Sequence, residues 1–201
     1  MSGAIIMKPI IWKRALAFLI DTLIISLILV IIYFFIPYHD YANELNKIIE
    51  SLLRDEISVR TYFVEMANVY QTAQQKDILL GIINLFLVIV FFIIVPYFKS
   101  KTIGQAINGI KIKSKKLTIA QLFIRAIVVN SILVTIITLA SVNLLTPIPY
   151  MVLVFVLSIV QLVIVVKSIF MILLNSDNRG LQDIWSNTEI VFEEEKNEKR
   201  V

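Results

Sequence analysis

Residues 13–26 read KRALAFLIDTLIIS, an apolar run that begins just after Arg14 and contains one carboxylate, Asp21. The run continues to Ile36, so it matches the ~20 residues that a helix needs to cross the hydrocarbon core of a membrane. Along such a helix, Asp21 lies almost two turns after Arg14, on nearly the same face and about 10 Å deeper. A carboxylate in lipid costs roughly 3 kcal/mol even on lenient insertion scales, so Asp21 needs a partner, a proton or water.

The composition is that of an integral membrane protein. Apolar residue types make up 58% of the 201 residues, and the mean hydropathy of +0.84 is well above that of soluble domains. The sequence has no cysteine, which excludes disulfides and thiolate chemistry. We expect the single histidine, His39, to be a solvated loop residue, because a metal site needs further ligands at suitable spacing.

Four apolar segments predict an all-α membrane protein with four transmembrane helices in a single domain, residues 1–201. The segments are long enough to span a membrane and lie at about 15–36, 78–98, 119–142 and 150–174. Residues 38–77 are polar, with apolar side chains at helical spacing, and predict one or two amphipathic helices that lie on the membrane surface or pack against each other. Residues 175–201 form a polar tail, and we expect residues 175–188 of it to fold back under the helices as an amphipathic or irregular segment.

The distribution of basic residues predicts the topology. The loop of residues 99–116 contains six lysines and no acidic residue: Lys99, Lys101, Lys111, Lys113, Lys115 and Lys116. We therefore expect four spans in the cytoplasmic membrane, with both termini cytoplasmic and residues 38–77 on the other side. In the alternative topology, the third and fourth segments form a re-entrant pair. Because the basic residues lie next to apolar segments, the expected partner is the lipid bilayer and not nucleic acid.

Three charged residues give the chain a family resemblance. An arginine opens the first span, an aspartate follows two turns later, and the motif RGLQD at residues 179–183 ends in a second aspartate. In these features the sequence resembles the RDD family of membrane proteins, which is named for one arginine and two aspartates. The matching residues are Arg14, Asp21 and Asp183.

The loop after the second span extends this resemblance. Residues 102–112, TIGQAINGIKI, are similar to the family's Thr-Pro-Gly-Lys-x-x-x-Gly-Leu-Arg-Val stretch. The loop positions that match this motif are Thr102, Gly104 and Gly109. The sequence departs from the family where proline, lysine and histidine are replaced by Ile103, Gln105 and Gln182.

Asp21 has two interpretations. The functional one is a cation or proton site, because a buried carboxylate can exchange a proton for a sodium ion. The structural one is an ion pair that fixes helix packing, with Arg125 or Lys167 as the partner, since both are expected at a similar depth. Arg14 either reaches up to the lipid phosphates or pairs with Asp21 or Asp183.

Asp183 is expected to accept hydrogen bonds from Arg14, Arg125 or Thr102. We expect Arg14 and Asp183 to shape the cytoplasmic entrance to Asp21. The two glycines of the loop, Gly104 and Gly109, could form a backbone nest that binds an anion.

The function that the resemblance implies is related to transport, since some members of the family have been linked to sodium/proton exchange. The alternative is a non-transporting assembly or accessory protein, in which residues 38–77 bind another membrane protein. A second copy of the chain is a further expected partner. The sequence contains no recognisable catalytic set or metal-ligand cluster, so we expect neither an enzyme nor a need for a metal or cofactor.

Overall fold

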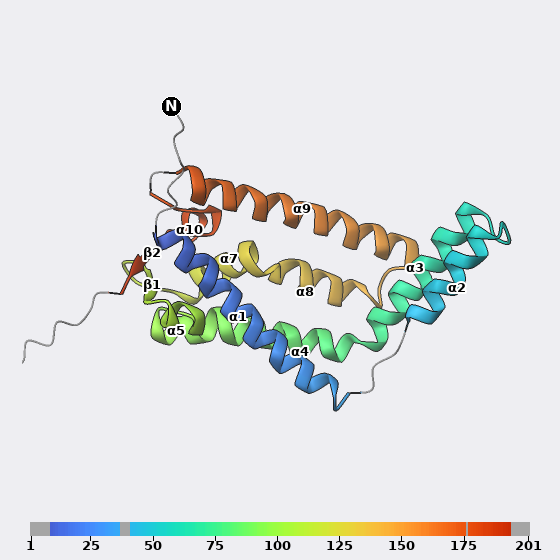
Figure 1. Cartoon of the computed structure of the whole chain (residues 1–201), viewed down its shortest axis with the longest axis horizontal. Helices are drawn as coiled ribbons and strands as arrows, with labels where there is room; N and C mark the ends of the chain where they lie inside the picture. The colour runs from blue at the N-terminus through green and yellow to red at the C-terminus, as the bar shows by residue number, and fades with distance from the viewer. Residues whose placement is uncertain (1–8, 37–40, 176, 194–201) are drawn as a thin grey trace, which may run out of the picture. The chain divides into compact units, whose positions relative to one another are not determined.

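The computed structural model describes residues 9–36, 41–175 and 177–193, which are mostly helical (Figure 1). His39 and the end of the predicted tail, residues 194–201, lie outside the described residues. The chain divides into two compact units. The first unit consists of residues 1–27, 87–130 and 164–201, and the second unit consists of residues 28–86 and 131–163.

Within the described residues, three long helices are apolar enough to cross a membrane. The first is α1 (Pro9–Tyr33) and the last is α9 (Pro147–Leu174). The second, Ile78–Lys99, is built from α4 (Ile78–Ile89), the wide π-helical turn η1 (Val90–Ile94) and α5 (Val95–Lys99). The chain is therefore an all-α, multi-pass membrane protein by the length and composition of its helices.

The expectation of one continuous helix over residues 119–142 is wrong. The structure has two helices there, α7 (Ile119–Asn130) and α8 (Ile132–Ser141). They are separated by Ser131, whose φ of 54° is left-handed and interrupts the right-handed helical path. The bent pair brings the number of candidate spans to four if it counts as one span.

The turn η1 lies just before a proline in the second span. In a regular α-helix, the ring of Pro96 would clash with the carbonyl group four residues earlier. The backbone widens here, and the Val95 N–H donates to the carbonyl oxygen of Val90, five residues back. Such π-helical turns often mark functional positions.

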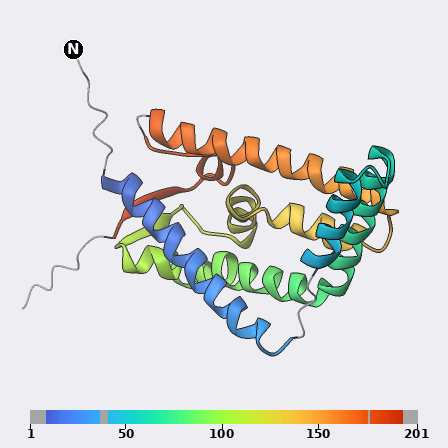
Figure 2. The ribbon, with the colours of Figure 1, turned by 45° about the vertical axis from the view of Figure 1, so that its right-hand side comes forward.

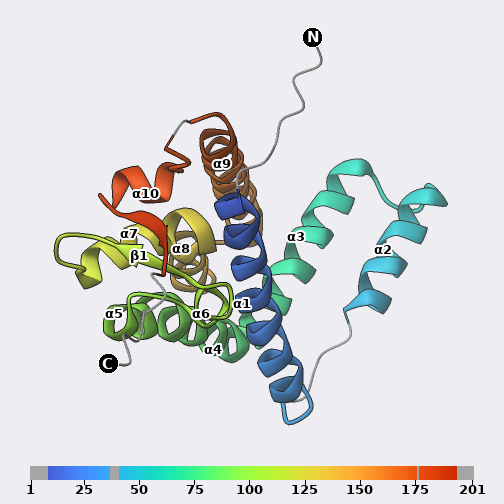
Figure 3. The ribbon, with the colours of Figure 1, turned by 60° about the vertical axis from the view of Figure 1, so that its left-hand side comes forward.

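A small sheet in the first unit was not expected from the sequence. Strands β1 (Ile110–Lys113) and β2 (Glu189–Phe192) pair antiparallel, with Ile110 opposite Phe192 and Lys113 opposite Glu189 (Figure 3). Strand β1 alternates isoleucine and lysine, so both isoleucines point into the core of the unit and are buried. This alternation is the local signal that could have predicted a strand.

Helix α6 (Ile103–Ile107) packs against the backbone of α1 in the first unit. Its N-terminus has a capping box, in which Thr102 Oγ1 accepts from the Gln105 N–H and the Gln105 side chain accepts from the Thr102 N–H. A Cβ atom on Gly104 would lie 2.1 Å from the Ala17 carbonyl oxygen. Only glycine permits this close approach.

In the second unit, residues 38–77 contain two amphipathic helices that pack against each other. These are α2 (Ala42–Leu53) and α3 (Val59–Lys76), which form a helical hairpin (Figure 2). Ser58 caps α3 by accepting a hydrogen bond from the Thr61 N–H. The buried Gln71 side chain donates to the carbonyl oxygens of Val142 and Leu145, both at 2.7 Å, and so satisfies carbonyl groups at the end of α8.

We predict that Gly104→Ala lowers the free energy of unfolding by about 1–3 kcal/mol, because the added methyl group must push α6 away from α1. The measurement is thermal unfolding of the purified protein in detergent. Gly109→Asn is the control, because the nearest atom to its Cβ position is Lys13 Nζ at 3.9 Å and asparagine tolerates the left-handed conformation of this turn. Equal melting temperatures for the two variants would contradict the prediction.

Candidate functional site

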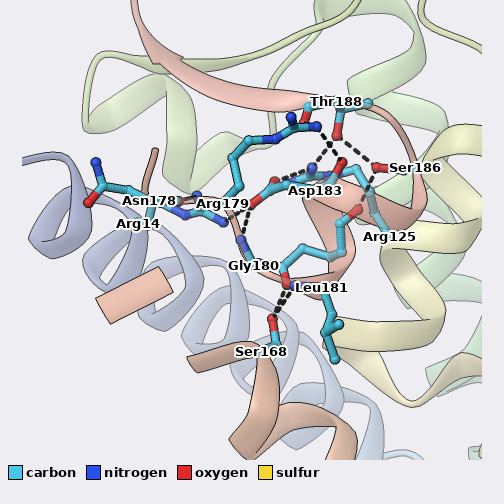
Figure 4. Close-up of polar contacts among 11 residues, drawn as sticks. Arg14, Arg125, Ser168, Asn178, Arg179, Gly180, Leu181, Asp183, Ser186 and Thr188 are labelled. Atoms are coloured by element: carbon cyan, nitrogen blue, oxygen red, sulfur yellow. Dashed lines mark hydrogen bonds and ion pairs between the residues drawn. The ribbon is translucent and has the colours of Figure 1, made fainter. Parts of the chain in front are cut away.

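Asp183 is the centre of a buried charge cluster in the first unit. It lies in the short helix α10 (Leu181–Trp185) and its side chain is fully buried. One carboxylate oxygen, Oδ2, accepts from Arg14 Nη2 of α1 at 2.5 Å, and the other, Oδ1, accepts from Arg125 Nη1 of α7 at 2.6 Å (Figure 4). The Gly180 N–H also donates to Oδ2, at 2.9 Å.

The two arginines bind the tail at further points (Figure 4). Arg14 Nη1 donates to the Asn178 carbonyl oxygen at 2.7 Å, and Arg125 Nη1 donates to Thr188 Oγ1 at 2.5 Å. Arg179 Nη2 donates to the carbonyl oxygens of Asp183 and Thr188 at 3.3 and 3.1 Å. Three guanidinium groups therefore hold the segment of residues 178–188 in place.

The charge state of Asp183 follows from these contacts. Burial alone would raise the pKa of its carboxyl group, but the charges of Arg125 and Arg14, together with the hydrogen bonds from Arg14 and Gly180, outweigh burial and lower the pKa below its ordinary value. A lowered pKa means that the ionised form stabilises the fold. This stabilisation is fully present above about pH 4 and is lost only as the pH falls further through the pKa of the folded state.

Asp21 is the second buried carboxylate of the first unit, and it has different partners from those expected. Its Oδ2 atom accepts from Thr102 Oγ1 at 2.5 Å, and its Oδ1 atom accepts from the Gly104 N–H at 2.7 Å. Neither predicted cation is bonded to it: Arg125 is bonded to Asp183, and the Lys167 side chain is exposed. No ion pair in the described part of the chain includes Asp21.

Thr102 and the N-terminus of α6 therefore bind Asp21 and not Asp183. The carboxylate of Asp21 lies at the N-terminus of α6, where free backbone N–H groups favour a negative charge. Of the backbone nest expected from Gly104 and Gly109, the structure shows one bond to an anion, from the Gly104 N–H to the side chain of Asp21. Gly109 takes no part in it and instead provides the left-handed turn, with φ of 62°, that leads into β1.

Asp21 and both arginines of the charge cluster line one pocket of about 620 Å³ within the first unit. Its walls come mainly from apolar side chains of α1, α7 and α9. The polar residues along its wall are Arg14, Asp21, Thr102, Gln105, Arg125, Asn130, Ser168 and Gln182. Apolar walls with a few convergent polar groups and a volume of several hundred Å³ are typical of sites for small molecules.

Four polar residues that line this pocket were not predicted as site residues: Gln105, Asn130, Ser168 and Gln182. Ser168 Oγ donates to Gln182 Oε1 and accepts from the Leu181 N–H at 3.1 Å, which fixes α10 against α9. Gln182 takes the place of the family's histidine, and its amide serves here as a hydrogen-bond partner. The signal that could have found Ser168 is a small polar residue within an otherwise apolar span.

Several long apolar helices with a buried charge cluster define a multi-pass α-helical membrane protein. The sequence profile of the RDD family matches residues 8–187, so the chain belongs to the RDD family. No curated protein and no solved structure gives a significant match to the chain.

We predict that Asp183→Asn lowers the free energy of unfolding by about 3–5 kcal/mol, because Arg14 and Arg125 would remain buried without a counter-charge. The melting temperature in detergent should fall by roughly 10 °C for a chain of this size. Glu193→Gln is the matched control, because it removes a carboxylate from the exposed pair with Lys101, and such pairs contribute only about 0–1 kcal/mol. Equal effects of both substitutions would show that burial of the Asp183 cluster is not important for stability.

Proposed function

We propose that this protein has a role in transport, in which Asp21 binds a proton or a cation at the wall of the pocket. The observation that carries the proposal is that Asp21 is buried but belongs to no ion pair among the described residues. A buried charge without a counter-charge is costly and favours uptake of a proton or a cation.

The contacts of Asp21 leave room for such binding. Thr102 and Gly104 are neutral donors, and each occupies one of the two carboxylate oxygens. An ionised carboxylate can accept about four hydrogen bonds, so each oxygen keeps a lone pair for a proton or a metal ion. Asp183 differs in this respect, because two guanidinium groups and a backbone N–H already occupy its oxygens.

The proposed transport also needs a route to Asp21, and the pocket supports one. It contacts Asp21 directly, and its volume of about 620 Å³ exceeds what a hydrated monovalent cation requires. Arg14 lines the same pocket. We propose that Arg14, held in place by its ion pair with Asp183, shapes the cytoplasmic entrance of the pocket, since the basic loops of the sequence support a cytoplasmic location for this end of the helices.

We predict that Asp21→Asn abolishes cation-driven proton flux. The purified protein is reconstituted in liposomes that contain a pH-sensitive dye, and a sodium or potassium gradient is applied. Proton flux through Asp21→Asn should fall to the level of protein-free liposomes, because the amide cannot exchange a proton for a cation. Asp55→Asn is the matched control, because Asp55 is exposed and has a left-handed φ of 55° that asparagine tolerates. No flux through the wild type, or equal flux through Asp21→Asn, would refute the proposal.

A second function, as an accessory protein that binds another membrane protein, is supported by the hairpin of α2 and α3. Near its turn, three apolar side chains are largely exposed: Leu53 at 77%, Val59 at 62% and Phe63 at 54%. Exposed apolar side chains that are grouped together often mark an interaction surface. If residues 38–77 lie outside the cytoplasm as the topology predicts, this surface would face partners on that side of the membrane.

If this second function holds, a photo-crosslinker attached at Phe63→Cys should capture one dominant hetero-partner in native membranes. The chain has no cysteine of its own, so the label is specific. Gln74→Cys is the control, because it places the same label on an exposed polar position of the same helix. Mass spectrometry identifies the products, and crosslinks between copies of the chain alone would contradict the accessory function.

A further inference from the structure

A second hollow of the first unit has a different character from the pocket at Asp21. It is a groove of about 350 Å³ between the second span and the start of α7, and its lining is apolar and aromatic. The turn η1 and helix α5 contribute Ile93, Ile94, Tyr97 and Phe98, and α7 contributes Ile119 and Phe123. Helices α5 and α7 contact each other beside it (Figure 3).

The shape of this groove depends on the wide turn before Pro96. A π-helical turn shifts the side chains that follow it relative to a regular α-helix, so η1 changes the direction in which α5 presents Tyr97 and Phe98. These two rings pack edge to face, with their centroids 5.2 Å apart. Tyrosine at the end of a span is typical of the membrane interface.

Basic residues flank the groove in the chain. Lys99 directly follows Phe98, and Lys115 and Lys116 come just before Ile119; all three lysines are exposed. Two other lysines of this loop already have acidic partners, because Lys101 pairs with Glu193 and Lys113 pairs with Glu189. No ion pair in the described part of the chain includes Lys99, Lys115 or Lys116.

We propose that the groove binds an acyl chain of an anionic phospholipid and that Lys99, Lys115 and Lys116 bind its phosphate group. The charges are complementary, because residues 99–116 contain six lysines and no acid, and basic clusters next to a span attract anionic lipids. A soluble anion would use the lysines alone and leave the apolar groove without an occupant. The combination of an apolar groove and free lysines favours a ligand that has both an acyl chain and a negative headgroup.

The test measures lipid binding to the full chain in detergent by native mass spectrometry. The wild type should bind dioleoyl-phosphatidylglycerol more tightly than dioleoyl-phosphatidylcholine. The triple variant Lys99→Gln, Lys115→Gln and Lys116→Gln should bind phosphatidylglycerol more weakly by a factor of about ten or more. The control variant Lys47→Gln, Arg54→Gln and Arg60→Gln removes the same charge from the hairpin of α2 and α3 and should bind like the wild type. Equal binding of both lipids by the wild type, or unchanged binding by the lysine variant, would overturn the proposal.

A second pair of variants tests the acyl chain separately from the phosphate. Ile94→Trp fills the groove and should weaken binding of phosphatidylglycerol, whereas Leu162→Trp enlarges an exposed side chain of α9 that does not line the groove and should not. Glycerol 3-phosphate at millimolar concentration should not displace the lipid. Displacement by glycerol 3-phosphate, together with normal binding by Ile94→Trp, would show a site for soluble anions and overturn the lipid proposal.

Discussion

The first unit depends on one buried carboxylate. Asp183 accepts hydrogen bonds from Arg14 of α1 and Arg125 of α7. These two arginines are more than a hundred residues apart in the chain. Removing one member would leave an uncompensated charge in a low-dielectric interior, so the three residues stabilise the structure only as a set. The tail of the chain therefore has to fold back onto the first and third apolar segments before the cluster is complete.

The second aspartate is held by a different kind of interaction. Asp21 is compensated by the N-terminus of α6 and a threonine hydroxyl, which are dipoles and not full charges. This arrangement requires α6 to approach α1 so closely that only glycine fits at position 104. The two aspartates of the family thus have separate environments: one forms a closed ion-pair cluster, and the other remains open to a pocket.

The sequence predicts which residues form helices better than it predicts which residues contact each other. Apolar length identifies the spans, and helical spacing identifies α2 and α3, because both signals are local. The break at Ser131 and the pairing of β1 with β2 depend on contacts between distant residues, which local patterns do not contain. The sequence correctly names Arg14 and Arg125 among the expected hydrogen-bond partners of Asp183. It does not reveal that Thr102 bonds to Asp21, because that choice depends on where α6 packs.

The charges around the pocket limit what can bind there. Asp183 is bonded to Arg14 and Arg125, so its carboxylate oxygens are occupied. Asp21 has only neutral donors, and it is the carboxylate that lines the pocket. Under the proposed function, replacing a bound proton at Asp21 with a monovalent cation leaves the net charge of the first unit unchanged. Such an exchange would therefore add no uncompensated charge to an environment in which that charge is costly.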